Sequence, residues 1–275
     1  GTGNDQTISG YNFNIANGSL LWVKSRNASN NWNQYDTIRG PKNRLVSNLT
    51  QAQDSSGGLD GFTSDGFTLR GGYDISQAFD YVTYAWKTNI PAINTDGTIQ
   101  SVVSANQAAG ISVVSYTGNN VAGSTIGHGL SAAPEIVIIK QLDITELWVV
   151  GSDFLNGGTS PWDYVLHLNN SNAESNQSWP WNDTAPSSSV ITIGNGGGIN
   201  TNGGTFITYA FKSIAGFSKM ASYSGNGGSK AITGLGFQPS WVMIKSTGSG
   251  NWMVYDSLRT VSVGDNPGTA NARPY

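Results

Sequence analysis

The sequence predicts an all-β protein made of antiparallel, two-sheet β-sandwich domains arranged in tandem. One pattern of residues occurs three times along the 275-residue chain. Short runs such as residues 81–86 and 252–255 alternate with the period of two that is typical of strands, and they are rich in β-branched and aromatic side chains. Pairs such as Asp60-Gly61 and Asn202-Gly203 separate such runs and tolerate the positive φ of tight hairpin turns.

The repeated pattern is a short apolar strand that ends at a lysine and is followed by a single tryptophan. The three lysines are Lys24, Lys140 and Lys245, and the tryptophans are Trp32, Trp148 and Trp252. Successive lysines lie about 110 residues apart, which is the size of a small domain and not of a solenoid repeat. A second shared strand, residues 81–87, returns as residues 206–212. We expect the shared residues to form the core, and any residue that recognises a partner to lie outside them.

These landmarks divide the chain into three units. Residues 1–92 form the first sandwich, without the strand that leads into the other two, and residues 93–214 form the second. Residues 215–275 hold the first half of a third. Because half a sandwich cannot bury its apolar faces alone, we expect the sequence to be a segment of a longer polypeptide. Helix signals are weak throughout, and the glycine run at residues 196–198 is expected to be a hairpin loop.

The composition excludes several classes of partner. Only 11% of the residues are charged, the net charge is −3, and no run of basic residues occurs, which argues against a nucleic-acid partner. There is no cysteine, so neither a disulfide framework nor thiolate chemistry is available. No stretch approaches the roughly 18 apolar residues of a membrane span. We also predict no cofactor.

Catalytic and metal-binding patterns are absent from the sequence. Glutamate occurs only at Glu135, Glu146 and Glu174, and no aspartate stands in a recognisable paired motif of the glycosidase type. The two histidines are far apart and lack metal-ligand or triad spacing. His128, between two glycines, is expected to be a turn residue that hydrogen-bonds to the backbone. We therefore predict no catalytic residue and no metal site, while a calcium ion bound by aspartates and carbonyls stays open.

An aromatic-rich insertion in the second unit is the candidate ligand site. Its aromatic and polar residues are Trp162, Tyr164, Trp179, Trp181, Asn182 and Asp183. Sugars stack their apolar faces on tryptophan, while amide and carboxylate groups bond to their hydroxyls, so this combination suits a glycan. The alternative is that the rings cap the edge of the sandwich or meet a neighbouring chain.

Several segments of the second unit resemble a known family. Residues 116–119, residues 127–130 and Ala133-Pro134 lead into the strand that ends at Lys140, and Trp148 follows. This order resembles a largely uncharacterised repeated domain in tail fibres and tail-associated proteins of marine bacteriophages, including cyanophages. The resemblance implies a jelly-roll or lectin-like sandwich and a location in the virion tail, outside the cell. The second unit departs from the pattern in one respect, because Ser152-Asp153-Phe154 replaces the Asp36 to Arg39 and Asp256 to Arg259 pairs of the others. We expect such a pair to be structural.

The leading hypothesis is a non-enzymatic structural or adhesive virion protein, part of a phage tail fibre or tail appendage. It would bind a host cell-surface glycan and other virion tail proteins, and would form a homo-oligomer, with a trimer as the usual state of fibres. The first alternative is a polysaccharide depolymerase, a tailspike-like glycoside hydrolase on the same scaffold. The second alternative is an extracellular adhesin or filament module of a bacterium.

Overall fold

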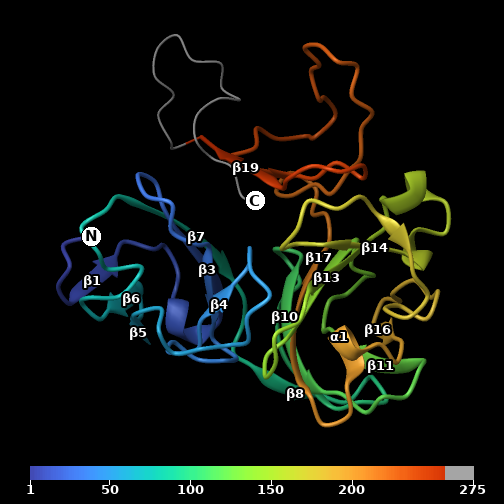
Figure 1. The fold of residues 1–275 in the computed structure, drawn as a ribbon, viewed down its shortest axis with the longest axis horizontal. Helices are drawn as coiled ribbons and strands as arrows, with labels where there is room; N and C mark the ends of the chain where they lie inside the picture. The colour runs from blue at the N-terminus through green and yellow to red at the C-terminus, as the bar shows by residue number, and fades with distance from the viewer. Residues whose placement is uncertain (258–275) are drawn as a thin grey trace.

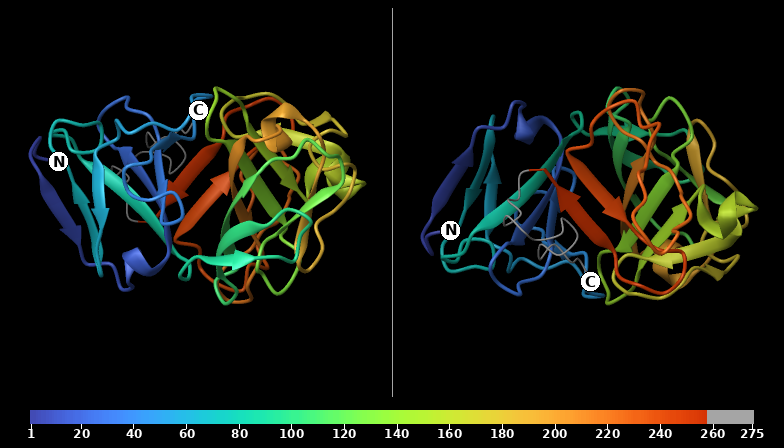
Figure 2. Two further views of the ribbon diagram at one scale, coloured as in Figure 1. Left: turned by 90° about the horizontal axis from the view of Figure 1, so that it is seen from below. Right: turned by 90° about the horizontal axis from the view of Figure 1, so that it is seen from above.

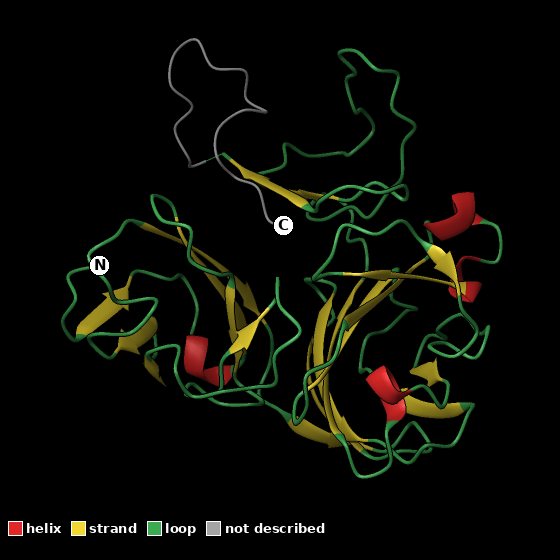
Figure 3. Ribbon diagram, in the orientation of Figure 1, coloured by secondary structure: helices red, strands yellow, loops and turns green. Residues whose placement is uncertain are grey.

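The computed structural model describes residues 1–257 and confirms the all-β fold class (Figures 1 and 3). Within these residues the named strands form five sheets, and every strand pair is antiparallel. The helical segments are short: η1 (Ile15–Asn17), η2 (Leu155–Gly158), η3 (Pro161–Asp163) and α1 (Gly197–Asn200). The last of these forms on the glycine run, where a hairpin loop was expected. That expectation was wrong, because two further residues extend the run into a single helical turn.

The first repeat is a sandwich of a three-stranded and a four-stranded sheet. The smaller sheet has the order β1 (Gln6–Ser9), β6 (Gly66–Leu69), β5 (Leu59–Phe62). The larger has the order β4 (Leu45–Val46), β3 (Asn33–Asp36), β2 (Ser19–Ser25), β7 (Tyr81–Lys87). Leu21 and Val23 of β2 point between the sheets and join a buried cluster with Phe67 of β6. The period-two pattern of β2 thus gives it one face inside the sandwich and one face outside.

The second repeat is larger and contains an eight-stranded sheet. Its order is β15 (Ser175–Asn176), β14 (Tyr164–His167), β13 (Trp148–Ser152), β12 (Ile136–Gln141), β17 (Thr205–Phe211), β10 (Ile111–Thr117), β9 (Ser101–Asn106), β8 (Ala92–Asn94). A two-stranded sheet, β11 (Ser124–Gly127) with β16 (Val190–Ile193), lies on one face. Val137 and Ile139 of β12 join Ile191 and Ile193 in the buried cluster between these two sheets.

The described part of the third repeat contributes a single hairpin, β18 (Trp241–Ile244) with β19 (Met253–Asp256). Figures 1 and 2 together show this hairpin lying across the junction of the first two repeats, on one side of both. The strand β8 begins at Ala92, so it spans the boundary predicted after that residue. The described part of the third repeat ends at residue 257.

A third buried cluster joins all three repeats. It contains Leu20 and Trp22 of the first repeat, Ile138 of the second, and Trp252 and Val254 of the third. The rings of Trp22 and Trp241 pack edge to face across the junction, with their centroids 6.4 Å apart. Large aromatic side chains bury much apolar surface, so this shared core stabilises the repeats against one another. The tandem repeats therefore pack against one another through a common core and are not domains joined only by linkers.

Two of the recurrent tryptophans, Trp148 and Trp252, each donate a hydrogen bond to the repeat before their own. The indole Nε1 of Trp148 donates to the carbonyls of Val46 and Leu49, at 3.2 and 3.0 Å. Similarly, Nε1 of Trp252 donates to the carbonyl of His167, at 3.0 Å. Val46 and His167 are equivalent positions, because each lies two residues before an asparagine whose side chain accepts a hydrogen bond from the backbone of its repeat's tryptophan. The second repeat thus contacts the first in the same way as the third contacts the second.

A recurrent tyrosine follows the same direction around the junctions. Tyr209 of the second repeat donates to Asp36 of the first, with 2.9 Å between the oxygens. Tyr84 of the first repeat donates to Asp256 of the third, at 2.8 Å. Both tyrosines come from the second shared strand, and both acceptors lie four residues after the recurrent tryptophan. The three repeats therefore meet in a ring with one direction of contact, from second to first, from first to third, and from third to second.

The recurrent lysines cap the hairpin loops that follow them. Lys24 donates to the carbonyls of Ser25 and Ala28, Lys140 to those of Gln141 and Ile144, and Lys245 to those of Asn172, Ser246 and Gly248. Burial lowers the pKa of Lys140 to about 8, although Glu146 and Asp143 partly counter the shift. These lysines thus satisfy loop carbonyls, a structural role.

Candidate functional site

Two of the predicted glycan-binding tryptophans lie in the core of the second repeat. Trp162 is 2% exposed and Trp181 is 0% exposed, and their rings pack edge to face at 5.2 Å. The indole of Trp162 also donates to Asp153, at 2.7 Å. A Cβ at Gly151 would lie 2.5 to 2.6 Å from both rings, so β13 passes this pair only because that residue is glycine. Neither ring has a face on which a sugar could stack.

The other four predicted residues retain some exposure. Tyr164 is half-buried and packs against the shared core. Trp179 is half-buried across the backbone of Gly196, and its Nε1 donates to Gln177, at 3.2 Å. Asn182 and Asp183 are exposed, and both have a φ of 50°. The accessible part of the predicted site is therefore one loop, residues 179–183, with a single half-buried ring.

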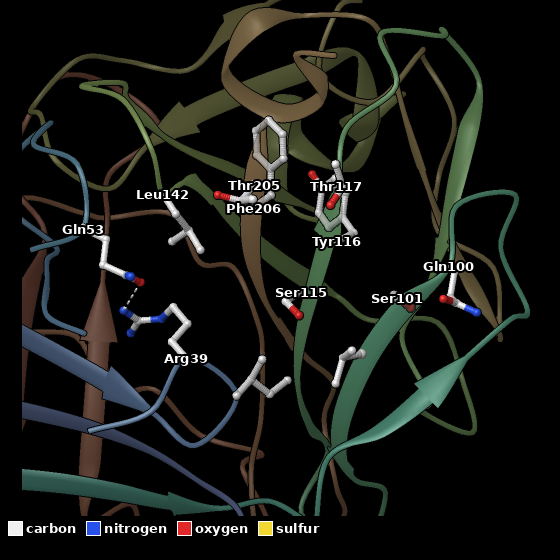
Figure 4. A pocket seen from close by; sticks show the side chains of 12 residues that line it. Arg39, Gln53, Gln100, Ser101, Ser115, Tyr116, Thr117, Leu142, Thr205 and Phe206 are labelled. Carbon is white, nitrogen blue, oxygen red and sulfur yellow. Dashed lines mark hydrogen bonds between the residues drawn. The ribbon is translucent and has the colours of Figure 1, made fainter. Parts of the chain in front are cut away.

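A pocket, which we call the seam pocket, lies where the first repeat meets the second (Figure 4). Its volume is about 390 Å³. It is lined by two loops of the first repeat, by strands β9, β10 and β17, and by single residues just before β9 and just after β12: Ile38, Arg39, Gln53, Gln100, Ser101, Val102, Ser115, Tyr116, Thr117, Leu142, Thr205 and Phe206. Tyr116 and Phe206 stack with their centroids 5.0 Å apart on neighbouring strands.

The accessible polar groups of the seam pocket are neutral. Gln100, Thr117 and Thr205 are exposed, and Ser115 is half-buried between them and the loops of the first repeat. These hydroxyls and amides can both donate and accept hydrogen bonds. Among residues 1–257, no aspartate, glutamate or histidine lines the pocket. The pocket is therefore suited to a neutral, hydroxylated ligand and offers no carboxylate for acid–base chemistry.

Arg39 is the one charged residue that the described part of the chain contributes to the lining, and its charge is already paired. Its Nε lies 2.6 Å from the carboxylate of Asp36, and both side chains are buried. Its terminal nitrogens donate to the carbonyl of Asn43 and to the side chains of Gln53 and Tyr209. The predicted Asp36 to Arg39 ion pair is thus present, and through Tyr209 it joins two repeats.

The corresponding pair in the third repeat cannot be compared, because Arg259 lies outside the described residues. Its aspartate, Asp256, accepts from Tyr84 across a junction, as Asp36 does from Tyr209. The second repeat has Ser152 at this position. The recurrent aspartates therefore serve the junctions between repeats, in agreement with the expected structural role.

The glutamates and His128 hold backbone groups. The carboxylates of Glu135, Glu146 and Glu174 accept from backbone N–H groups of Ser213, Leu147 and Asn156. His128 hydrogen-bonds to the backbone, as expected. Its Nδ1 accepts from the N–H of Leu130, at 3.1 Å, so Nε2 carries the proton and donates to the carbonyl of Ser187, at 3.2 Å. Burial lowers the pKa of His128 and favours this neutral ring.

Two absences concern residues 1–257, the part of the chain that the structure describes. No group of three or more His, Cys, Asp or Glu side chains in this part of the chain is placed to hold a metal ion. In the same range, no helix has the length and apolar character needed to cross a membrane.

Fold and site together define a class: β-sandwich repeats closed around a shared aromatic core, with a neutral polar pocket at one seam. Residues 1–271 match the model of a domain of unknown function, DUF7483, and the chain belongs to that family. A single family model thus spans all three repeats, in keeping with their common core. No curated protein matches the chain. No solved structure matches it either.

Sequence reasoning did not find the seam pocket. Its polar residues, such as Ser115, Thr117 and Thr205, are ordinary members of strands that alternate between polar and apolar side chains. They become a pocket only because the loops that carry Ile38 and Gln53 close over them from another repeat. One sequence signal for the pocket was present: Thr117 and Thr205, at the ends of β10 and β17, are both polar and are cross-strand partners.

Proposed function

We propose that this chain is a non-enzymatic adhesive and structural module of a bacteriophage tail, located in the virion outside the cell, and that it binds a host-surface glycan in the seam pocket. The observation that carries the proposal is the neutral polar lining of that pocket, in which exposed and half-buried hydroxyls and amides lie together and no carboxylate or histidine of residues 1–257 takes part. The resemblance of the repeats to phage tail domains supports the setting. Repeated sandwiches of low charge, without a paired acid motif, support adhesion over turnover.

In this proposal the sugar hydroxyls bond to Gln100, Ser115, Thr117 and Thr205, which Figure 4 shows along the strands that form one wall of the pocket. A single pocket of this kind binds weakly. Linked copies raise the effective concentration of each site, so an oligomer, with a trimer as the usual state of a fibre, would give strong attachment from weak individual sites. The loop that carries Trp179 is a second place where a sugar could stack.

Binding to purified capsule and lipopolysaccharide fragments of candidate hosts, measured by biolayer interferometry, tests the site. Thr117→Trp places a ring at an exposed strand end that lines the pocket and should abolish binding. Thr7→Trp is the matched control, because Thr7 is exposed on β1 and far from the pocket lining, and it should bind as the wild type does. Trp179→Ala should leave binding unchanged. Loss of binding in Trp179→Ala alone would move the site to the loop, and no binding by the wild type to any glycan would overturn the proposal.

The alternatives give different outcomes in two further assays. Shortened glycan chains after incubation with the protein would establish a depolymerase and reject the non-enzymatic assignment. Antibodies against the chain should label the tails of virus particles in electron micrographs. Labelling of the surfaces of uninfected bacteria, with unlabelled particles, would support a bacterial adhesin.

A further inference from the structure

The sheet face that lines the seam pocket continues beyond the pocket onto the edge strand β8. On this face, Ser115 of β10 pairs with Val102 of β9, and Val102 pairs in turn with Ile93 of β8. Cross-strand partners carry their side chains on the same face of a sheet, about 5 Å apart. The preceding residue, Ala92, pairs with Val103, which belongs to the core on the opposite face. Ile93 therefore lies beside Val102, next to the pocket.

Ile93 and Val102, which we call the apolar pair, are accessible and belong to no core. Ile93 is 69% exposed and Val102 is half-buried, and neither is part of the three buried clusters of residues 1–257. In contrast, the other two apolar residues of the lining, Ile38 and Leu142, pack against the shared core. A single exposed isoleucine is ordinary. Two apolar side chains in cross-strand contact beside a polar pocket form a surface that can cover the apolar part of a ligand.

A row of polar side chains runs across the strands beside the apolar pair. Thr117 of β10 pairs with Thr205 of β17, and Gln100 continues the row because the next residue, Ser101, pairs with Tyr116. Gln100, Thr117 and Thr205 line the pocket and are exposed (Figure 4). Neighbouring strands lie about 4.8 Å apart, so the row spans about 10 Å from β9 to β17. A ligand of more than one sugar can therefore lie across these strands, with hydroxyls and amides along it and the apolar pair at one end.

We propose that the apolar pair is a second subsite of the seam pocket and receives the methyl group of a neutral sugar in an oligosaccharide that crosses β17, β10 and β9. This inference rests on the proposed function and adds the class of sugar to it. Neutral sugars carry a methyl group either as C6 of a 6-deoxyhexose or in the acetyl group of an N-acetylhexosamine. A methyl group placed on Ile93 and Val102 removes apolar surface from water, whereas a hydroxyl placed there loses water without gaining a partner.

Matched pairs of free sugars test the proposed class. L-rhamnose differs from L-mannose only in having a methyl group where mannose has a hydroxymethyl group. The β-1,4-linked tetramer of N-acetylglucosamine differs from that of glucose only in its acetamido groups. In titrations followed by saturation-transfer NMR, the methyl-bearing member of a pair should bind about 4-fold more tightly, which corresponds to about 0.8 kcal/mol for one buried methyl-sized group. Its methyl protons should also receive the strongest saturation.

The two pairs distinguish the two sources of the methyl group. A preference in the rhamnose pair alone assigns the subsite to a 6-deoxyhexose, and a preference in the tetramer pair alone assigns it to an acetamido group. Equal binding within both pairs, or binding of neither pair, would overturn the inference. The proposed function is tested separately on host glycans, so it can survive that result.

Replacement of Ile93 tests the position of the subsite. Ile93→Ser should weaken binding of the methyl-bearing sugar about 4-fold and leave binding of its partner sugar unchanged, because only the methyl group contacts residue 93. Ile232→Ser is the matched control, since Ile232 is 43% exposed on a loop of the third repeat and does not line the pocket. It should bind both sugars as the wild type does. A full methyl preference in Ile93→Ser, with binding lost in Thr117→Trp, would reject the subsite and leave the proposed function in place.

Sedimentation velocity of the same variants tests the alternative occupant of this surface, a second copy of the chain. Ile93→Ser and Ile232→Ser should both sediment as the wild type does, because a glycan subsite has no part in self-association. A smaller assembly in Ile93→Ser alone would assign Ile93 to a contact between copies and would overturn the inference.

Discussion

The junction between the first and second repeats is closed, whereas the junction between the first and third is more open. Both use a tyrosine that donates to an aspartate of the neighbouring repeat. Asp36 and Tyr209 are fully buried, and Arg39 pairs with the aspartate. Asp256 and Tyr84 are only half-buried. The same recurrent residues thus make contacts of different depth at the two junctions.

The two junctions therefore differ in how far water can reach the same hydrogen bond. A hydrogen bond between exposed partners competes with water and contributes little. The same bond between fully buried partners has no water to replace it, so losing one partner leaves a buried polar group unsatisfied. The closed junction should therefore be the more sensitive to substitution, and equivalent changes in the two junctions measure the difference.

Removal of the junction aspartates should give the largest effect. Asp36→Ala leaves the buried Arg39 charge unpaired and should lower the free energy of unfolding by about 3–5 kcal/mol. Asp256→Ala removes the acceptor of Tyr84 from a half-buried site and should lower it by less. Urea unfolding monitored by tryptophan fluorescence measures both values. Equal losses in the two variants would show that the junctions do not differ in depth.

A smaller difference is expected when only the tyrosine hydroxyls are removed. Tyr209→Phe takes one donor from a fully buried carboxylate and should lower the free energy of unfolding by about 1–3 kcal/mol. Tyr84→Phe should lower it by about 0.5–1.5 kcal/mol, because its partner is partly solvated. The ring is retained in each variant, so the aromatic packing of the shared core serves as its own control. A larger loss in Tyr84→Phe than in Tyr209→Phe would contradict the comparison.

The elements that the sequence predicted are those specified by short-range patterns. The strand before each recurrent lysine and the strand at residues 81–87 and 206–212 were identifiable because side chains alternate between two faces with a period of two. The Asp36 to Arg39 pair was also identifiable, since its members are three residues apart. Its third partner, Tyr209, lies 173 residues away from the aspartate. No local pattern reveals such a contact.

The candidate site was harder to predict for the same reason. Trp162 and Trp181 have the composition of a sugar-binding patch, but packing against Gly151 buries them. Whether a tryptophan lies in a core or on a surface depends on its tertiary neighbours, which residue type and spacing do not specify. The seam pocket likewise requires two repeats to meet, so only the assembled structure shows it.

The buried lysine of the second repeat extends the comparison to pH. Because burial lowers the pKa of Lys140 to about 8, below the roughly 10.4 of an unfolded lysine, the unfolded chain binds more protons between these values. The free energy of unfolding should therefore rise from pH 8 to 9.5, by up to about 1.4 kcal/mol per pH unit from this group. Lys140→Met should remove that share of the rise. Lys245 is half-buried, and burial lowers its pKa, so Lys245→Met should flatten the slope less. Urea unfolding at pH 8, 8.75 and 9.5 measures these slopes. Parallel slopes for the wild type and Lys140→Met would show that the second repeat does not hold its lysine in a desolvated site. The contrast in depth between the junctions would then depend on the aspartate and tyrosine variants alone.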